Sequence, residues 1–252
     1  FFCALLSFSL NTAAYTAVDE AQTHAEEAFA VNEAGARNVA LAAAAARIPL
    51  LHISTDYVFD GRASSPYRET DAATPVNVYG RSKRAGEIAV CEAYPAAFVL
   101  RTSWLYSAHG RNFVRAMLGL ADRSVVRLVD DQRGSPTSAH DLAAALLAMI
   151  DRIAARAAAP APGVYHVSAA GEATWFGLAQ RLFRRWRALG RAAPRLEPIS
   201  TADYGAPAPR PAYSVLDCSK FKRAFGMALP DWTMSLDRCL DRLAQTQPEN
   251  TA

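Results

Sequence analysis

Leu50-Leu51-His52-Ile53-Ser54-Thr55-Asp56-Tyr57 is the stretch of this 252-residue sequence that decides the fold. Its first five residues form a mostly apolar run of strand length, which predicts a strand buried on both faces. Residues 31–47, just before it, are rich in helix formers, and Pro49 ends that helix. A helix followed at once by a buried strand is typical of a parallel βαβ unit.

The same alternation continues along the chain. Further strands are predicted at 98–104, 125–129 and 164–168, and further helices at 77–94, 112–123, 138–156, 174–189 and 231–244. Segments 60–75 and 199–211 are rich in Pro, Gly and polar residues and are predicted to be irregular. Ser138 and Asp141 have the spacing of a helix capping box. This pattern predicts an α/β protein with a Rossmann-like, doubly wound parallel sheet.

The domain division follows from where the strands become sparse. Residues 1–156 are expected to form the dinucleotide-binding domain, and 163–170 to return to its sheet after a linker at 157–163. Residues 171–252 contain fewer strands and more Pro, so we expect them to form mainly a smaller α/β substrate-binding lobe.

Composition excludes several classes of protein. Hydrophobic residues make up 51% of the chain, so disorder is excluded. The net charge is only +3 and the basic residues are dispersed, so we expect no nucleic-acid partner. The apolar run at 1–10 is shorter than the roughly 20 residues that cross a bilayer, so no membrane partner is expected. Four widely separated cysteines form no C-x-x-C pair, which favours a reducing cytoplasm over a disulfide framework.

Polar residues follow the first buried strand at once, at Ser54, Thr55, Asp56 and Tyr57. In an open α/β sheet, ligands bind outside the carboxyl ends of the strands, so this cluster is well placed for a polar substrate. The alternative is that Thr55 and Asp56 only cap and turn the chain.

Tyr79 and Lys83 are four residues apart on a predicted helix and therefore lie on one face. A nearby ammonium lowers the pKa of a tyrosine, whose ordinary value is near 10. Such a phenol can exchange a proton with a carbonyl or alcohol oxygen. The alternative is a surface tyrosine beside a solvated lysine. The chain has only three lysines, which slightly favours function.

Two further segments could contact a ligand. Trp104 closes the Arg101-Thr102-Ser103-Trp104 segment at a strand end, where it could stack on a sugar or base, or pack in the core. The small residues of Asn11–Thr16 would let the backbone approach a ligand closely. Neither G-x-G-x-x-G nor G-x-x-x-x-G-K-[ST] occurs in the sequence.

Taken together, several motifs resemble one family, the dTDP-4-dehydrorhamnose reductases of the extended short-chain dehydrogenase/reductase superfamily. One motif alone would not be specific, but in combination and in this order they are. The matching stretches include NTAAYTAVDEA (11–21), HISTDYVFDG (52–61), NVYGRSK (77–83), RTSW (101–104), DDQRGSPT (130–137), PRPAYSVLD (209–217) and LPDW (229–232).

The resemblance implies a reaction and a cofactor. Hydride from NADPH or NADH would reduce the C4 keto group of dTDP-4-dehydro-L-rhamnose to give dTDP-L-rhamnose. Tyr79 would protonate the C4 oxygen, Thr55 would bond the same oxygen, and Lys83 would hold the nicotinamide ribose and lower the tyrosine pKa. No metal is expected.

The resemblance also implies binding residues. Asp56 and Trp104 would contact the nucleotide-sugar, and Ala14, Tyr15 and Thr16 would lie along the cofactor. We expect a cytoplasmic monomer or homodimer.

The front of the sequence departs from the family pattern. Members begin with strands and a Gly-rich phosphate loop, which puts the cofactor pyrophosphate on a helix N-terminus. This sequence begins with Phe1 and has no such loop. We therefore expect the sheet to lack its first strands, the native protein to carry the segment upstream, and these 252 residues alone to bind the dinucleotide weakly.

Three other interpretations stay open at this point. An epimerase or dehydratase of the same superfamily shares the Tyr/Lys pair, although RTSW and DDQRGSPT favour a reductase. A non-catalytic subunit, like the regulatory subunit of methionine adenosyltransferase, is a different class, but the intact STDY and RTSW stretches argue against it. A decayed gene product with no working cofactor site is the third.

Overall fold

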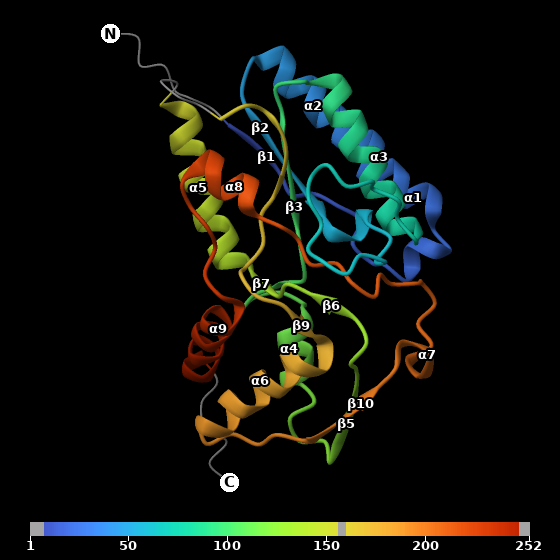
Figure 1. Ribbon diagram of the computed structural model, residues 1–252, viewed down its shortest axis with the longest axis vertical. Helices are drawn as coiled ribbons and strands as arrows, with labels where there is room; N and C mark the ends of the chain where they lie inside the picture. Colours follow the sequence, from blue (N-terminus) through green and yellow to red (C-terminus); the bar gives the residue numbers. More distant parts are fainter. Residues whose placement is uncertain (1–7, 156–159, 247–252) are drawn as a thin grey trace.

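A four-stranded parallel sheet forms the centre of the larger unit of the molecule (Figure 1). The computed structural model describes residues 8–155 and 160–246. The strands lie in the order β1-β2-β3-β8, and each neighbouring pair is parallel. Their bounds are β1 (Ser9–Asn11), β2 (Leu50–Thr55), β3 (Phe98–Thr102) and β8 (Gly163–His166).

Helices cover both faces of this sheet, as predicted for a doubly wound fold. Leu50 of β2 packs with the alanines of α2 (Ala36–Ala46), on the side that α3 (Val78–Ala93) also covers. Its neighbour Leu51 points the other way, toward α5 (Ala139–Ala154) and α8 (Ser219–Phe225). Figure 1 shows the two helical layers on opposite sides of the sheet. Because successive side chains of a strand alternate, a strand buried on both faces is apolar throughout.

The helix before β2 begins earlier than predicted. It runs through α1 (Ala25–Phe29), a π-helical turn (Ala30–Gly35) and α2, so the expected start at residue 31 is wrong. The π turn carries the buried Asn32. A Cβ at Gly86 of α3 would lie 2.0 Å from the Asn32 carbonyl oxygen, so glycine lets the two helices meet here.

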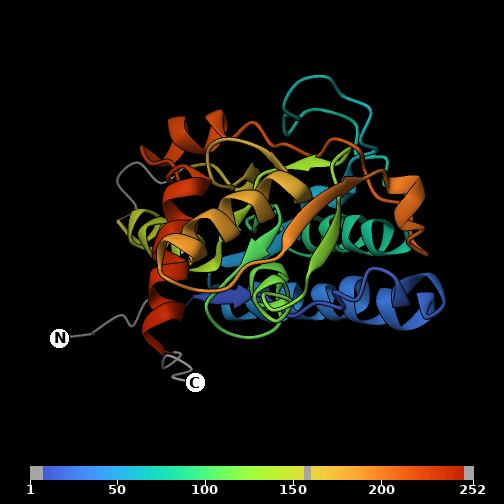
Figure 2. The same ribbon diagram turned by 90° about the horizontal axis from the view of Figure 1, so that it is seen from below.

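A second unit lies at the other end of the molecule, where α6 (Trp175–Ala188) and α9 (Trp232–Thr246) lie side by side (Figure 2). Leu182, Trp186 and Leu240 belong to its buried core. Arg181 and Arg185 of α6 pair with Asp237 and Asp241 of α9. The unit also contains α4 (Phe113–Leu118), β5 (Val125–Val129), β10 (Arg195–Ile199) and α7 (Thr201–Tyr204).

Several details of the second half differ from the sequence prediction. The strand at 125–129 exists, but it pairs with β10, outside the main sheet. The segment predicted to be irregular contains α7, and β10 and α8 were not predicted. The helix starting near residue 112 ends at Leu118, before residue 123. Residues 156–159, at the start of the predicted linker, lie outside the described residues.

The predicted capping box at the start of α5 is wrong. The Ser138 side chain makes no capping hydrogen bond. The Asp141 carboxylate instead accepts hydrogen bonds from Ser235 and Arg238 of α9, which ties the two units together. Asp141 therefore makes a tertiary contact with α9 in place of the local capping contact that was predicted.

Short elements complete the connections between the units. They are the 3-10 helices at Glu20–Gln22 and Asp56–Val58, and the two-residue strands β4 (Leu105–Tyr106), β6 (Arg133–Gly134), β7 (Thr137–Ser138) and β9 (Ala173–Thr174). Within residues 8–155 and 160–246, no helix has the length and apolar character that crossing a bilayer would need. The same residues contain no group of three His, Cys, Asp or Glu side chains that could hold a metal ion.

Candidate active site

A cleft of about 390 Å³ opens where β2 and β3 reach their carboxyl ends, between the two units. It brings together seven of the eight predicted site residues, which come from four separate parts of the chain. These residues are Ala14, Thr16, Thr55, Asp56, Tyr79, Lys83 and Trp104. The eighth, Tyr15, is not among the lining residues.

Helix α3 positions Tyr79 and Lys83. Asn77 caps the helix by accepting a hydrogen bond from the Gly80 N–H at 2.7 Å, and its amide donates to the Pro209 carbonyl at 2.8 Å. A Cβ at Gly80 would lie 2.2 Å from the Tyr57 carbonyl oxygen, so the helix start lies directly against the segment that follows β2. The Tyr79 ring meets the Tyr57 ring edge to face, with centroids 5.8 Å apart.

Burial sets the protonation of this pair. It raises the pKa of Tyr79 to about 12, although a hydrogen bond with Thr55 opposes the rise. Tyr79 is therefore a neutral phenol near pH 7, the form that can give up a proton. Burial lowers the pKa of Lys83 to about 8, with Glu87 opposing, and its Nζ donates to the Ile53 carbonyl at 2.7 Å. The expected lowering of the tyrosine pKa by Lys83 is not found here, because burial dominates and Lys83 is not among the groups that shift this pKa.

Three hydroxyl groups of the protein hold the Asp56 carboxylate. Its Oδ1 accepts from Thr55 Oγ1 at 3.1 Å, and its Oδ2 from Ser103 Oγ at 3.0 Å and Ser214 Oγ at 2.5 Å. The residue is 2% exposed. Burial raises the pKa of its carboxyl group to about 6, and the three hydroxyl donors oppose this rise.

Trp104 forms one wall of the cleft. Its ring stacks on Trp175 of α6, with centroids 3.5 Å apart and ring planes 2° from parallel. Its backbone has a φ of 44°, which is unusual for a bulky residue and is found where surrounding structure enforces it. Sequence analysis offered two alternatives for Trp104, contact with a ligand or packing in the core. The structure combines parts of both, because Trp104 packs against a second tryptophan and also lines the cleft.

The segment after β1 is fixed by two asparagines. Asn11 pairs with the His52 ring and accepts from the Ala13 N–H at 3.1 Å. Asn32 accepts from the Tyr15 N–H at 2.8 Å and donates to the Tyr15 carbonyl at 3.1 Å, as a neighbouring strand would. This arrangement turns the Tyr15 side chain toward Ala28 and Val78 and leaves Ala14 and Thr16 in the cleft.

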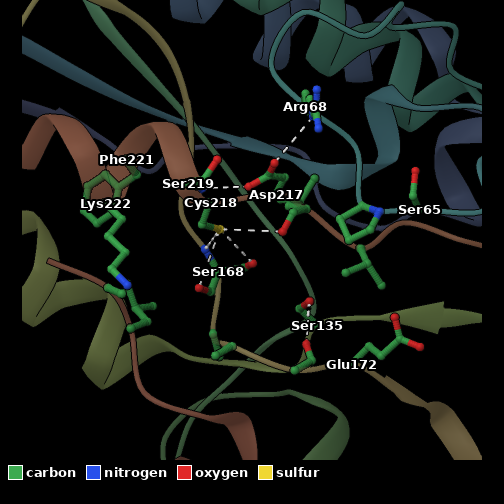
Figure 3. A pocket seen from close by; sticks show the side chains of 18 of the residues that line it. Ser65, Arg68, Ser135, Ser168, Glu172, Asp217, Cys218, Ser219, Phe221 and Lys222 are labelled. Carbon is green, nitrogen blue, oxygen red and sulfur yellow. Dashed lines mark hydrogen bonds and ion pairs between the residues drawn. The ribbon is translucent and has the colours of Figure 1, made fainter.

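A larger cavity of about 750 Å³ lies between the loop near Arg68, the segment after β8 and the segment leading into α8 (Figure 3). Cys218, Ser168 and the Arg68–Asp217 ion pair lie around it. None of the predicted site residues lines it, so the smaller cleft is the candidate active site.

Comparisons with known proteins decide the family. Residues 6–245 match the family model described as RmlD substrate binding domain. A dTDP-4-dehydrorhamnose reductase of Sinorhizobium fredii is 45% identical over 230 residues, which are 91% of this chain and 78% of the relative. The chain belongs to the dTDP-4-dehydrorhamnose reductase family.

Two further relatives bear on cofactor and substrate. The crystal structure of a dTDP-4-dehydrorhamnose reductase from Bacillus anthracis in complex with NADP superposes with a TM-score of 0.85 at 37% identity, covering 92% of this chain and 79% of that one. A dTDP-4-keto-6-deoxy-D-glucose reductase of Streptomyces niveus is 39% identical over 236 residues, which are 93% of this chain and 78% of the relative.

Sequence reasoning missed several residues of this reductase site. Thr102 lines the cleft with a buried hydroxyl that has no hydrogen-bond partner in the described part of the chain, as expected of a group that bonds a ligand. Thr102 lies within the RTSW motif, so the motif was a usable signal. Gly134 lies in DDQRGSPT and Ser214 in PRPAYSVLD, but their contacts with Trp104 and Asp56, like the stack of Trp175 on Trp104, arise only from the fold.

The cleft fits the nicotinamide end of a dinucleotide. The unpartnered Thr102 hydroxyl can bond an amide or hydroxyl, and the buried Lys83 ammonium lies in the same cleft. The small Ala14 and the short Thr16 on the opposite segment permit close approach. Lys83, Thr102 and the segment 14–16 are therefore the residues that would hold the cofactor.

Proposed function

We propose that Tyr79 is the proton donor in reduction of the C4 keto group of dTDP-4-dehydro-L-rhamnose to dTDP-L-rhamnose, with NADPH as the cofactor. The observation that carries this proposal is the meeting of Tyr79, Thr55 and Lys83 in one cleft at the carboxyl end of the sheet. The family and the NADP complex of the Bacillus anthracis relative support the reaction and the cofactor.

Each side chain has a definite task. The bound cofactor supplies the hydride that reaches C4. Tyr79, neutral because burial raises its pKa to about 12, gives its proton to the C4 oxygen as negative charge develops there. Thr55 bonds the same oxygen and polarises the keto group. Lys83 holds the nicotinamide ribose, and its positive charge favours the phenolate that Tyr79 leaves behind.

We propose Trp104 as the residue that packs against the nucleotide-sugar. Its stack with Trp175 gives a rigid aromatic wall, and a sugar can pack on such a surface. The contact between Asp56 and the nucleotide-sugar stays a prediction, since both its carboxylate oxygens already accept hydrogen bonds within the protein.

We also propose the division of labour between the two units. Residues 1–156, with 163–170, would hold the cofactor, and residues 171–252 would mainly hold the nucleotide-sugar. We further propose that the protein is cytoplasmic and is a monomer or a homodimer. Sedimentation of the purified protein would distinguish the two oligomeric states.

The test compares Tyr79→Phe with the wild type and with Tyr204→Phe, which alters an exposed tyrosine away from the cleft. NADPH oxidation is followed with dTDP-4-dehydro-L-rhamnose and, separately, with dTDP-4-keto-6-deoxy-D-glucose, and products are identified by mass spectrometry and NMR. We expect turnover of the first sugar, and a loss of roughly 10²–10⁴-fold in kcat with little change in KM for Tyr79→Phe only. Wild-type turnover by Tyr79→Phe would refute the assignment. Faster turnover of the second sugar would instead assign dTDP-4-keto-6-deoxy-D-glucose as the substrate.

A further inference from the structure

The hydroxyl of Thr55 has one proton, which it can donate to only one hydrogen-bond partner at a time. A threonine hydroxyl can donate one hydrogen bond and accept two. Thr55 Oγ1 donates to Asp56 Oδ1 at 3.1 Å and accepts from the Tyr57 N–H at 3.2 Å, and Tyr79 is a third hydrogen-bond neighbour of this hydroxyl. The only hydroxyl proton of Thr55 is therefore engaged by Asp56.

That arrangement conflicts with the task of Thr55 in the proposed reaction. To polarise a keto group, a hydroxyl must donate its proton to the keto oxygen, because that oxygen can only accept. While Asp56 is a carboxylate, it can only accept as well. Thr55 cannot donate to both, so in the donor role its hydrogen bond to Asp56 either breaks or reverses, and only reversal keeps the two groups hydrogen-bonded to each other.

We propose that Asp56 is a positioning residue whose neutral acid form donates to Thr55 and so turns the single Thr55 proton toward the C4 oxygen. This inference rests on the proposed function, because it concerns the same keto group. The proton on Asp56 comes from water and is not transferred to the product. The reaction still consumes one hydride and the Tyr79 proton.

The geometry around Asp56 suits a reversal of one hydrogen bond only. Oδ1 contacts Thr55, whereas Oδ2 accepts from both Ser103 and Ser214. A proton on Oδ1 therefore inverts the bond to Thr55 and leaves the other two intact. Because Ser103 follows β3 and Ser214 belongs to the C-terminal segment, the carboxyl group stays fixed in either form.

The surroundings make the neutral form accessible. The groups that hold the carboxyl from β3 and from the C-terminal segment are the neutral hydroxyls of Ser103 and Ser214. In the described part of the chain, the ionisable groups near it are Tyr57, next to it in the chain, Tyr79 of α3, and Lys83, which lines the same cleft. Asp56 raises the pKa of both tyrosines. Burial raises the pKa of Asp56 itself to about 6. A polar ligand oxygen competing for the Thr55 proton favours the neutral form further.

Asp56→Asn tests this directly, because an amide has one donor end and one acceptor end. Its nitrogen can donate to Thr55 while its oxygen accepts from Ser103 and Ser214. We expect this variant to keep most of the wild-type kcat, whereas loss of the predicted contact between Asp56 and the nucleotide-sugar would raise KM alone. We also expect the wild-type kcat to fall about tenfold per pH unit above the pKa of Asp56, and this decline to be absent in Asp56→Asn.

A second variant keeps the inference testable if Asp56→Asn does not fold. Ser214→Ala removes a donor that stabilises the carboxylate, so the pKa of Asp56 rises and the decline of kcat moves to higher pH. Ser219→Ala, an exposed serine of the same segment, is the matched control and should leave the profile unchanged. The ¹³C NMR titration of the Asp56 carboxyl should shift in parallel with the profile of Ser214→Ala.

The outcomes separate this inference from the proposed function. An Asp56→Asn protein that is folded and binds the nucleotide-sugar but has lost kcat would show that a carboxylate is required, and would overturn the inference alone. A Ser214→Ala profile identical to that of the wild type would do the same. A wild-type protein that does not reduce the sugar would overturn the proposed function, and the inference with it.

Discussion

The Trp104 indole lies directly against the backbone of Gly134. A Cβ at Gly134 would lie 2.4 Å from Trp104 Cε2 and 2.5 Å from Nε1, closer than such atoms approach. Trp104 has its other contact with Trp175, so the ring is held between β6 and α6. The glycine of the DDQRGSPT motif therefore has a steric role at the candidate active site, because it leaves room for the Trp104 ring.

Gly134→Ala should displace the Trp104 ring and weaken binding of the nucleotide-sugar. The Trp104 ring would be displaced from its position against residue 134, whereas the Tyr79 hydroxyl would not move. We therefore expect KM for the sugar to rise roughly 10-fold, about 1.4 kcal/mol, with a smaller change in kcat. Steady-state kinetics with varied sugar concentration measures both. Gly35→Ala is the control, because a Cβ there meets only the Ala30 carbonyl oxygen, at an ordinary 3.5 Å. Equal KM values for the two variants would contradict the role given to Gly134.

Asn32→Asp should weaken cofactor binding without touching the catalytic pair. The Asn32 amide donates to the Tyr15 carbonyl and to Ser82 Oγ, and an aspartate cannot donate to the carbonyl. We expect the segment 14–16 to move and the Kd for NADPH to rise roughly 10-fold, the effect of one buried hydrogen bond left unsatisfied. Fluorescence titration measures it. Asn112→Asp is the matched control, because it also removes amide donors, to the Ser107 and His109 carbonyls, but at a residue that does not line the cleft, so it should bind NADPH as the wild type does.

The central sheet could be predicted because its strands are buried on both faces. Runs such as LLHIS and FVLRT are typical of strands in a parallel sheet that is covered by helices on both faces. The second unit was harder. Strand β10 has the sequence Arg-Leu-Glu-Pro-Ile, with no buried residue, so neither periodicity nor an apolar run revealed it. Helix α8 is only seven residues long, too short for a clear helical pattern.

The site residues that belong to a recognisable motif could be predicted from the sequence. Those brought to the site only by the folding of distant segments could not. Tyr79, Lys83 and Thr55 stood out by their residue types and by their positions at a helix start and a strand end. Ser214 lies 158 positions from Asp56 in the sequence, and no spacing rule connects the two. Tyr15 was expected along the cofactor; its backbone pairs with Asn32 and it is not among the residues that line the cleft, so its contact with the cofactor stays a prediction.

Glu87→Gln should destabilise the fold strongly. Glu87 and Arg101 form a buried ion pair with two hydrogen bonds of 2.8 Å, and Ser54 donates to Glu87 at 2.6 Å. Neutralising the acid leaves a buried guanidinium without its counter-charge, which costs about 3–5 kcal/mol. Urea denaturation should show this loss as a lower midpoint. Glu172→Gln, which breaks a largely exposed pair with Arg133, should change the free energy of unfolding by less than about 1 kcal/mol.

His166 should make the protein less stable in mild acid. Its Nδ1–H donates to the Tyr67 carbonyl at 3.0 Å, and its Nε2 faces the Arg101 guanidinium at 3.4 Å, an arrangement that requires a neutral ring. Burial, reinforced by Arg101, lowers the pKa of His166 from 6.5 to about 4. Between these pH values the unfolded chain binds a proton at His166 that the folded protein does not, so the contribution of His166 to stability falls as the pH falls.

The full effect of His166 is about 3 kcal/mol between pH 6.5 and pH 4, with no further gain above pH 6.5. His52, also buried and with its pKa lowered to about 3, acts in the same direction. Urea denaturation at a series of pH values measures the slope, and His166→Asn should make it shallower. His140→Asn replaces an exposed ring and should leave the slope as it is. A slope that is the same in wild type and His166→Asn would mean that the buried ring is not the group that titrates.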